Sequence, residues 1–342
     1  MRGVQSTAAE GAEEVVNMQL RNVGAALALL ALILTGCGGQ ALQAPSTDVA
    51  PQDLTPVVLA PGERLRILAT TSIVADVVAA IGGSRAEVTA LVPPGVDPHA
   101  FEPTPQDVRA VADAQVIFEN GLGLEAFLGD LVKSAGAGVP VVSASSSIEP
   151  LAAGSHAAEG ETAGHTEWDP HVWLDPQNVI LWTEVIEASL SALDPQGAAD
   201  YARAAEAYRL ELQALDTEIE AELAAIPEHQ RWLVTDHEAF AYFAERYGFE
   251  VVGTVIPAPS TAAEPTARDL AALEDAIRST GVRAVFVSSV VNPALAQQVA
   301  EDTGIRLVTL YVGSLSGSSG PAPTYLELMR LNARLIAEAL AG

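Results

Sequence analysis

The sequence predicts an α/β protein in which two lobes, each built on a parallel sheet, are joined by one long helix. Short apolar runs alternate with helical stretches from Arg64 onward, a pattern typical of parallel sheets with helices on both faces. The same alternation restarts at Trp232, after a long stretch with no strand pattern. A chain of 342 residues is also long enough for two separate cores.

The first 36 residues have the organisation of a secretory signal. Arg21 precedes an unbroken run of 12 apolar residues, Val23 to Leu34, and small residues follow it. A helix of that length rises only about 18 Å, too little to span a hydrocarbon core of about 30 Å. A basic region, an apolar region and small residues together indicate a cleaved signal. Either Met1 or Met18 can be the translation start.

The signal ends in Leu34-Thr35-Gly36-Cys37, which resembles a bacterial lipobox, where the cysteine is lipidated and becomes the first mature residue. Cys37 is the only cysteine, which excludes an intramolecular disulfide. The alternative is a signal followed by a lone buried cysteine. We expect residues 1–36 to be removed and Cys37 to be the lipid attachment site. Residues 37–63 are then a flexible tether rich in Gln, Ala, Pro, Ser and Thr.

The N-terminal lobe is expected over residues 64–194. Its predicted strands are Leu65–Ala69, Glu87–Leu91, Gln115–Phe118 and Val139–Val142. Its predicted helices are Ile73–Ile81, Pro105–Ala112, Leu124–Val132 and Pro176–Leu193. The last of these begins with proline, which suits the first helical turn because the N–H it lacks would have no partner there.

A linking helix over residues 195–226 follows, rich in Ala, Glu, Leu and Arg and stopping at Pro227. About 28 helical residues rise about 42 Å, too far for a loop inside one domain. The alternative is an ordinary amphipathic helix on one lobe.

The C-terminal lobe is expected over residues 227–342. Its predicted strands are Leu233–Thr235, Glu250–Val255, Ala284–Val287 and Arg306–Leu310. Its predicted helices are Glu238–Tyr247, Thr266–Thr280, Ala294–Thr303 and Tyr325–Leu340. Glycine directly follows the first three of these helices, as is common where a helix ends in a left-handed residue.

The charge balance excludes one class of partner. Lys and Arg total 17 against 44 Asp and Glu, a formal net charge of −27. Such a surface repels a phosphate backbone, so we expect no nucleic-acid partner. It does not repel cations.

Three of the six histidines lie where ligands bind in open α/β sheets, outside the carboxyl ends of strands. His99 is in a Pro/Gly loop after a strand, His171 precedes the helix at Pro176, and His237 follows a strand. Imidazole is a common ligand of transition metals. Two of the three come from the first lobe and one from the second, so they could converge across a cleft. Alternatively, each is a solvated or hydrogen-bonded loop residue.

Four aspartates are placed to accept the second ring N–H of a ligating histidine: Asp97, Asp169, Asp175 and Asp236. Each is equally explained as a turn or capping residue. The remaining histidines have weaker settings. His156 and His165 lie in the polar stretch 154–166, which we favour as a solvated surface loop over a transient metal contact, and His229 is expected to be structural.

Longer motifs surround the three histidines. In chain order they are Asp97-Pro98-His99 with Glu102-Pro103-Thr104-Pro105, Asp169-Pro170-His171-Val172-Trp173-Leu174-Asp175-Pro176, Asp236-His237-Glu238-Ala239-Phe240, Glu264-Pro265-Thr266 and Gly320-Pro321-Ala322-Pro323-Thr324-Tyr325. With a lipobox in front and a long helix in the middle, the chain resembles the substrate-binding lipoproteins of bacterial zinc and manganese ABC importers. The resemblance covers residues 64–341.

The resemblance implies that a metal ion is held in the interlobe cleft by His99, His171 and His237. Histidine at the third position is similar to the zinc-type members, and three nitrogen ligands suit zinc better than manganese. It therefore implies Zn²⁺, with Mn²⁺ as second choice, and delivery to an ABC permease in the cytoplasmic membrane. It also implies a monomer, held to membrane lipid through acylated Cys37 on the outer face of that membrane or in the periplasm, with no enzyme activity.

Two departures from the family pattern leave the fourth ligand open. Gly313 stands where many members carry an aspartate, and Ser288 stands where a glutamate often follows the strand. Water is the first choice, because a three-histidine zinc site can keep an open position. Glu102 or a histidine of the 154–166 stretch is the second.

Three other functions compete with this one. Three histidines and a water also form a catalytic zinc site, which lowers the pKa of the water to about 7, so a secreted zinc hydrolase or lyase is an alternative. The sequence has no His-Glu-x-x-His run to support it. The others are a manganese-specific binding protein of the same family and a surface adhesin on the same scaffold.

Overall fold

The computed structural model describes residues 50–154 and 168–341, within one compact unit of residues 47–342. The predicted signal, Cys37, His156 and His165 lie outside the described residues. In the described part of the predicted tether, Leu54 is buried, and the Val57 N–H donates to the Leu193 carbonyl at 2.7 Å. The chain therefore contacts the first lobe before residue 63.

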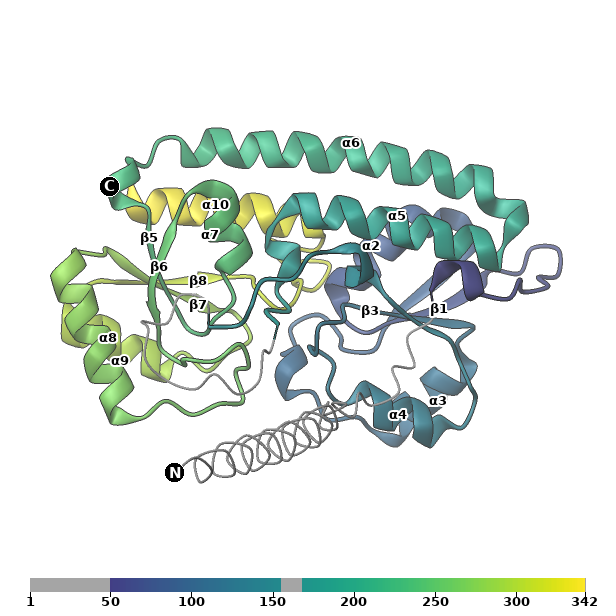
Figure 1. The fold of residues 1–342 in the computed structure, drawn as a ribbon, viewed down its shortest axis with the longest axis horizontal. Helices are drawn as coiled ribbons and strands as arrows, with labels where there is room; N and C mark the ends of the chain where they lie inside the picture. Colours follow the sequence, from purple (N-terminus) through teal and green to yellow (C-terminus); the bar gives the residue numbers. More distant parts are fainter. Residues whose placement is uncertain (1–49, 155–167, 342) are drawn as a thin grey trace, which may run out of the picture. The chain divides into compact units, whose positions relative to one another are not determined.

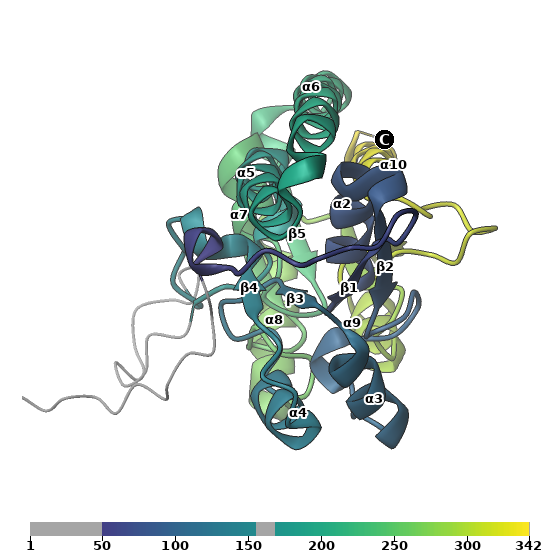
Figure 2. The same cartoon turned by 90° about the vertical axis from the view of Figure 1, so that its right-hand side faces the viewer.

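The first sheet is entirely parallel, with the strand order β2-β1-β3-β4. Its strands are β1 (Leu65–Ala69), β2 (Ala86–Ala90), β3 (Val116–Glu119) and β4 (Val141–Ser143). Its helices are α2 (Ser72–Gly82), α3 (Pro105–Asp113), α4 (Leu128–Ala135) and α5 (Pro176–Leu193). Figure 2 shows α2 and α5 on one side of this sheet and α3 and α4 on the other.

The second sheet repeats this topology, with the parallel order β6-β5-β7-β8. Its strands are β5 (Trp232–Thr235), β6 (Glu250–Thr254), β7 (Ala284–Ser288) and β8 (Arg306–Leu310). Its helices are α7 (Ala241–Tyr247), α8 (Ala267–Thr280), α9 (Ala294–Thr303) and α10 (Tyr325–Leu340). The predicted fold class of two parallel-sheet lobes is confirmed.

The long helix between the lobes is α6 (Ala198–Leu223), preceded by a 3-10 turn over Pro195–Gly197. It is shorter than the predicted span 195–226, because the turn takes up its first residues. In Figure 1 it runs along both lobes, and it packs on α5 and α2 of the first and on α10 of the second. The alternative of a helix confined to one lobe is therefore wrong. The lobe boundaries 64–194 and 227–342 stay predictions.

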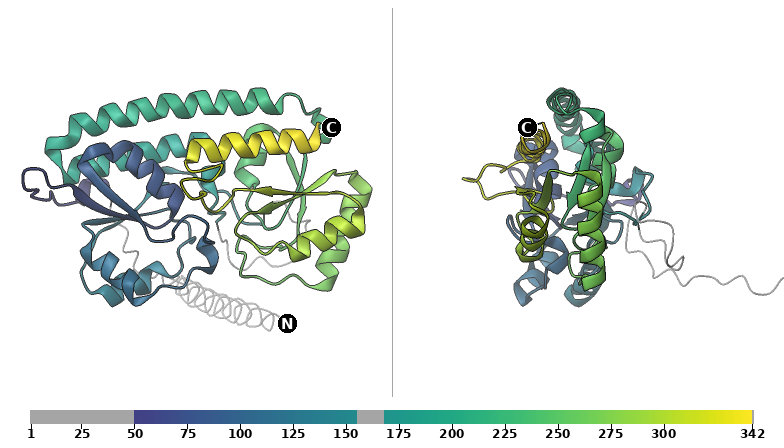
Figure 3. Two further views of the ribbon diagram at one scale, coloured as in Figure 1. Left: turned by 180° about the vertical axis from the view of Figure 1, so that it is seen from behind. Right: turned by 90° about the vertical axis from the view of Figure 1, so that its left-hand side faces the viewer.

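One apolar core is continuous across both lobes beneath α2, α5, α6 and α10. It contains Trp182 and Phe118 from the first lobe and Phe243 and Phe286 from the second. Seen from behind, α10 lies between α6 and the second sheet (Figure 3), and it contacts α6, α2 and β8. Separate clusters lie against α3 and α4 and against α8 and α9. A shared core of this kind resists a wide separation of the lobes.

Besides α6, two helices begin three or more residues later than predicted, and in both cases nearby backbone donors have partners outside the helix. α4 begins at Leu128 rather than Leu124, because the N–H groups of Asn120 and Gly121 bind the buried Glu125 carboxylate at 2.7 and 3.1 Å. α7 begins at Ala241 rather than Glu238, because the Glu238 N–H donates to the Ala258 carbonyl at 3.0 Å. The second difference leaves His237 in a loop.

Within the described residues, no helix is long and apolar enough to cross a membrane.

Candidate metal centre

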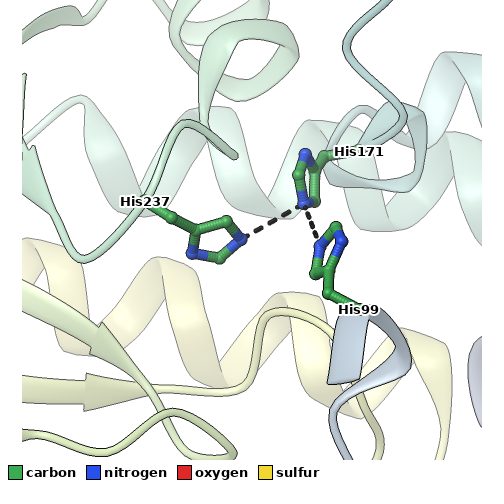
Figure 4. A group of neighbouring side chains, drawn as sticks. All are labelled: His99, His171 and His237. Carbon is green, nitrogen blue, oxygen red and sulfur yellow. Dashed lines mark hydrogen bonds between the residues drawn. The ribbon is translucent and has the colours of Figure 1, made fainter. Parts of the chain in front are cut away.

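Three histidines from separate loops point toward one another (Figure 4). The His171 Nε2 atom lies 3.1 Å from Nε2 of His99 and 3.2 Å from Nε2 of His237. One nitrogen from each ring falls within 4.8 Å of the others, and this is the only such cluster of His, Cys, Asp or Glu among the described residues. The sequence predicted these three side chains, and the structure brings them together.

Carboxylates orient two of the three rings. The Nδ1 atom of His171 lies 2.8 Å from Asp169 Oδ1, and that of His237 lies 2.8 Å from Asp236 Oδ1. When Nδ1–H donates to the carboxylate, the lone pair of Nε2 is left facing the centre, which is the form that binds a metal. Asp236 is held in turn by the Ser288 N–H, 2.6 Å from its Oδ2.

His99 is held differently. It lies on a 3-10 turn over Pro98–Ala100, and its backbone N–H donates to Asp97 Oδ1 at 2.9 Å. Its ring Nδ1 has no hydrogen-bond partner among the described residues, and the side chain is partly exposed. His171 and His237 are buried. The centre therefore has two rings oriented by carboxylates and one, His99, whose ring has no carboxylate partner among the described residues.

The electrostatics keep two of the three rings neutral, which is the form that binds a metal ion. Burial, followed by repulsion from His171 and His237, lowers the pKa of His99 to about 3, and burial lowers the pKa of His171 well below its usual value. Burial also opposes the charged form of His237, but the charge of Asp236 and the hydrogen bond to it outweigh burial and raise the pKa of His237. Two neutral rings with facing lone pairs repel each other unless a proton or metal ion lies between them.

The spacing also suits a tetrahedral ion. Zinc–nitrogen bonds of about 2.05 Å at tetrahedral angles place the nitrogens about 3.3 Å apart. The separations from His171 Nε2 to Nε2 of His99 and of His237 are 3.1 and 3.2 Å. A metal ion of that size can therefore bind with little movement of His171.

The other sequence candidates lie outside the cluster. Asp175 caps α5 by accepting from the Gln177 N–H at 2.8 Å and does not orient a histidine. Glu102 and His229 are exposed. Gly313 lies against the His99 turn, since a Cβ built on it would be 3.2 Å from Pro98 Cδ. No described carboxylate joins the three nitrogens.

Long-range contacts that secure the centre, two of them between the lobes, have no signal in the sequence. The indole Nε1–H of Trp173 donates to the Val312 carbonyl at 2.8 Å, and the Tyr242 hydroxyl donates to the Asp169 carbonyl at 3.0 Å. The Asn120 amide donates to the Pro170 carbonyl at 3.0 Å, directly before His171. These partners are 50 to 139 residues apart in the chain.

Comparisons with known proteins place the chain in a family. Residues 67–339 match the family model for the periplasmic component A of zinc-uptake complexes, ZnuA. The manganese-binding lipoprotein MntA of Halalkalibacterium halodurans is 36% identical over 305 residues, covering 89% of this chain and 93% of its own. The iron-binding protein YfeA of Yersinia pestis is 34% identical over 278 residues, covering 81% and 86%. The periplasmic zinc-binding protein TroA of Treponema pallidum superposes with a TM-score of 0.72 at 27% identity, over 82% of this chain and all of its own.

Proposed function

This chain belongs to the ZnuA family, the periplasmic component A of zinc-uptake complexes, and we propose that it captures Zn²⁺ with His99, His171 and His237. The family consists of extracytoplasmic metal-binding components of ABC importers and not of enzymes. The metal ion is the cargo, which the protein, acting as a monomer, delivers to the permease of its importer.

The observation that carries this proposal is the convergence of three Nε2 atoms from both lobes. Imidazole nitrogen is a good ligand for zinc, whereas manganese prefers more oxygen. The relatives' names point to manganese, iron and zinc, so the donor set of this chain is what favours zinc. Water takes the fourth position, since the described carboxylates nearest the rings already bind the Nδ1 atoms.

Competitive titration tests the choice of ion. The purified mature protein is loaded with equimolar zinc and manganese and its metal content is measured, and each ion is then titrated against the other. We expect zinc to displace manganese from the three-histidine site in every protein molecule. Retention of manganese in the presence of equimolar zinc would show that the donor set does not decide the ion.

The open fourth position gives a prediction at Gly313. A Cβ at this residue would be 3.2 Å from Pro98 Cδ, so Gly313→Ala should push the His99 turn and weaken zinc binding a few-fold. Gly313→Asp carries the same Cβ but adds a carboxylate that can replace the water. We expect Gly313→Asp to bind zinc about tenfold more tightly than Gly313→Ala, as measured by calorimetry. Equal affinities for the two variants would show that a side chain at 313 does not reach the ion.

We also propose that acylated Cys37 anchors the protein to the outer face of the cytoplasmic membrane. The support is the lipobox at residues 34–37 and the lipoprotein relatives. We expect Cys37→Ser to move the protein from the membrane fraction to the soluble fraction or to leave an uncleaved precursor, as seen by fractionation and intact mass. A variant with wild-type mass and membrane association would contradict lipid attachment at this residue. Stable anchoring needs more than one acyl chain.

A further inference from the structure

The loop that carries His99 is tied to the opposite lobe. Asp97 uses its two carboxylate oxygens in two directions: Oδ1 accepts from the His99 N–H at 2.9 Å, and Oδ2 accepts from the Thr261 hydroxyl at 2.6 Å. Thr261 lies in the loop between β6 and α8. One carboxylate thus joins a first-lobe histidine to the lobe that carries His237.

Two further contacts hold the same loop against the second lobe. The Gly95 N–H donates to the Ser314 hydroxyl at 2.8 Å and to the Leu315 carbonyl at 3.1 Å. Pro98 lies close enough to Gly313 that a Cβ there would meet its ring at 3.2 Å. Among these contacts, the hydrogen bond from Thr261 to Asp97 bears most directly on His99, because the same carboxylate also accepts from the His99 N–H.

The three histidines therefore differ in how firmly the protein holds them, and so in how easily each can release a metal ion. His171 and His237 are buried and fixed by carboxylates on their own lobes. His99 is partly exposed, its ring has no such partner among the described residues, and its turn depends on the second lobe. Because the two lobes share one continuous core, the least costly way to open the centre is a local movement of the His99 loop.

We propose that Thr261 is a positioning residue for His99, and that breaking its hydrogen bond to Asp97 is the step that lets bound metal leave. A short hydroxyl–carboxylate hydrogen bond is among the stronger kinds in proteins. While it is intact, His99 is held over the other two nitrogens. When it breaks, the His99 turn can move away, and the ion keeps only two protein ligands. This inference rests on the proposed function, since it concerns the release of the same ion.

The test compares zinc release from three single-residue variants by stopped-flow mixing with an excess chelator. Thr261→Val keeps the shape of the side chain and removes the donor, and we expect its dissociation rate to rise about tenfold with little change in the association rate. Thr261→Ser keeps the donor and should release zinc at nearly the wild-type rate. Thr217→Val is the matched control on the exposed face of α6, where the hydroxyl donates to the Gln213 carbonyl of the same helix, and it should leave the rate unchanged.

Thermal unfolding separates positioning from a purely structural role. We expect Thr261→Val to leave the unfolding midpoint of the metal-free protein near that of wild type and to reduce the upward shift produced by zinc. Wild-type release rates in Thr261→Val, or fast release in Thr261→Ser, would overturn the proposal. So would equal losses of stability with and without zinc. Failure of the wild-type protein to bind zinc would instead defeat the proposed function.

Discussion

Replacing His171 with alanine is expected to lower zinc affinity by at least about a hundredfold. Apparent free energies of about 10–16 kcal/mol for four-ligand zinc sites correspond to roughly 3 kcal/mol per ligand, and 1.4 kcal/mol is tenfold in affinity. Loss of His171 should cost at least this free energy per ligand, because its Nε2 lies next to both other nitrogens, 3.1 Å from that of His99 and 3.2 Å from that of His237. Its loss also leaves the buried Asp169 carboxylate without its ring partner. Isothermal titration measures the change.

Because His171 is buried, His99→Ala is the companion variant, and it should also lose affinity strongly while perturbing the fold less. His229→Ala is the matched control, since His229 is exposed on the 3-10 turn Glu228–Gln230. It should bind zinc like wild type. Unfolding midpoints of the metal-free variants show whether each one is folded. Wild-type zinc affinity in a folded His171→Ala protein would show that the three histidines are not the ligands.

Mild acid is expected to release the metal with the uptake of one proton, not three. Burial lowers the pKa of His99 to about 3 and that of His171 well below its usual value, so both rings favour the neutral form in mild acid. Burial lowers the pKa of His237, but the charge of Asp236 and the hydrogen bond to it outweigh burial and raise this pKa above its ordinary value. Below that pKa, its Nε2 carries a proton that can donate to His171 Nε2, 3.2 Å away, in the position of the metal.

The direction and slope of the change in zinc affinity with pH follow from this single competing proton. Zinc affinity should be constant above the pKa of His237 and should fall tenfold for each pH unit below it. At pH 5.5 it should be clearly lower than at pH 8, because the raised pKa of His237 keeps its ring protonated in mild acid. Titrations from pH 8 to 5 give the slope. Asp236→Asn removes the charge that raises this pKa and should move the onset of release to lower pH.

A slope of two or three protons per ion would show that His99 or His171 also titrates in this range. No change in affinity down to pH 5 would show that Asp236 does not raise the pKa of His237. Either result would contradict the electrostatics of the centre, while the ligand assignment would still be decided by the alanine variants.

Much of the fold could be predicted from the sequence, because it depends on local patterns. The observed bounds equal the predicted ones for β1, α5, α9, β8 and α10. The signals used for them are the spacing of apolar residues, a proline in the first turn and a glycine after the helix, and all of these come from neighbouring residues. Leu124 and Glu238 were misplaced as helix starts. Their loops are set by hydrogen bonds to a buried carboxylate and to the carbonyl of residue 258, neither of which is a local signal.

The sequence also singled out the three histidines as candidate ligands, because each lies beside a strand end or helix start, where ligands bind in open α/β sheets. It could not show that their Nε2 atoms meet, since 72 and 66 residues separate them and their distances depend on how two lobes pack. Asp169 and Asp236 orient histidine rings, as predicted, whereas Asp175 caps a helix. The sequence allowed both roles for each of these aspartates and could not choose between them.

The asymmetry of the centre was decided by tertiary structure alone. Nothing near Thr261 in the sequence marks it as a partner of Asp97, 164 residues away. The contact exists because the continuous core under α6 fixes both lobes at one separation, and at that separation a hydroxyl from one lobe reaches a carboxylate of the other. Local sequence thus determined which side chains can bind a metal ion, and the packing of the lobes determined which of them is held least firmly.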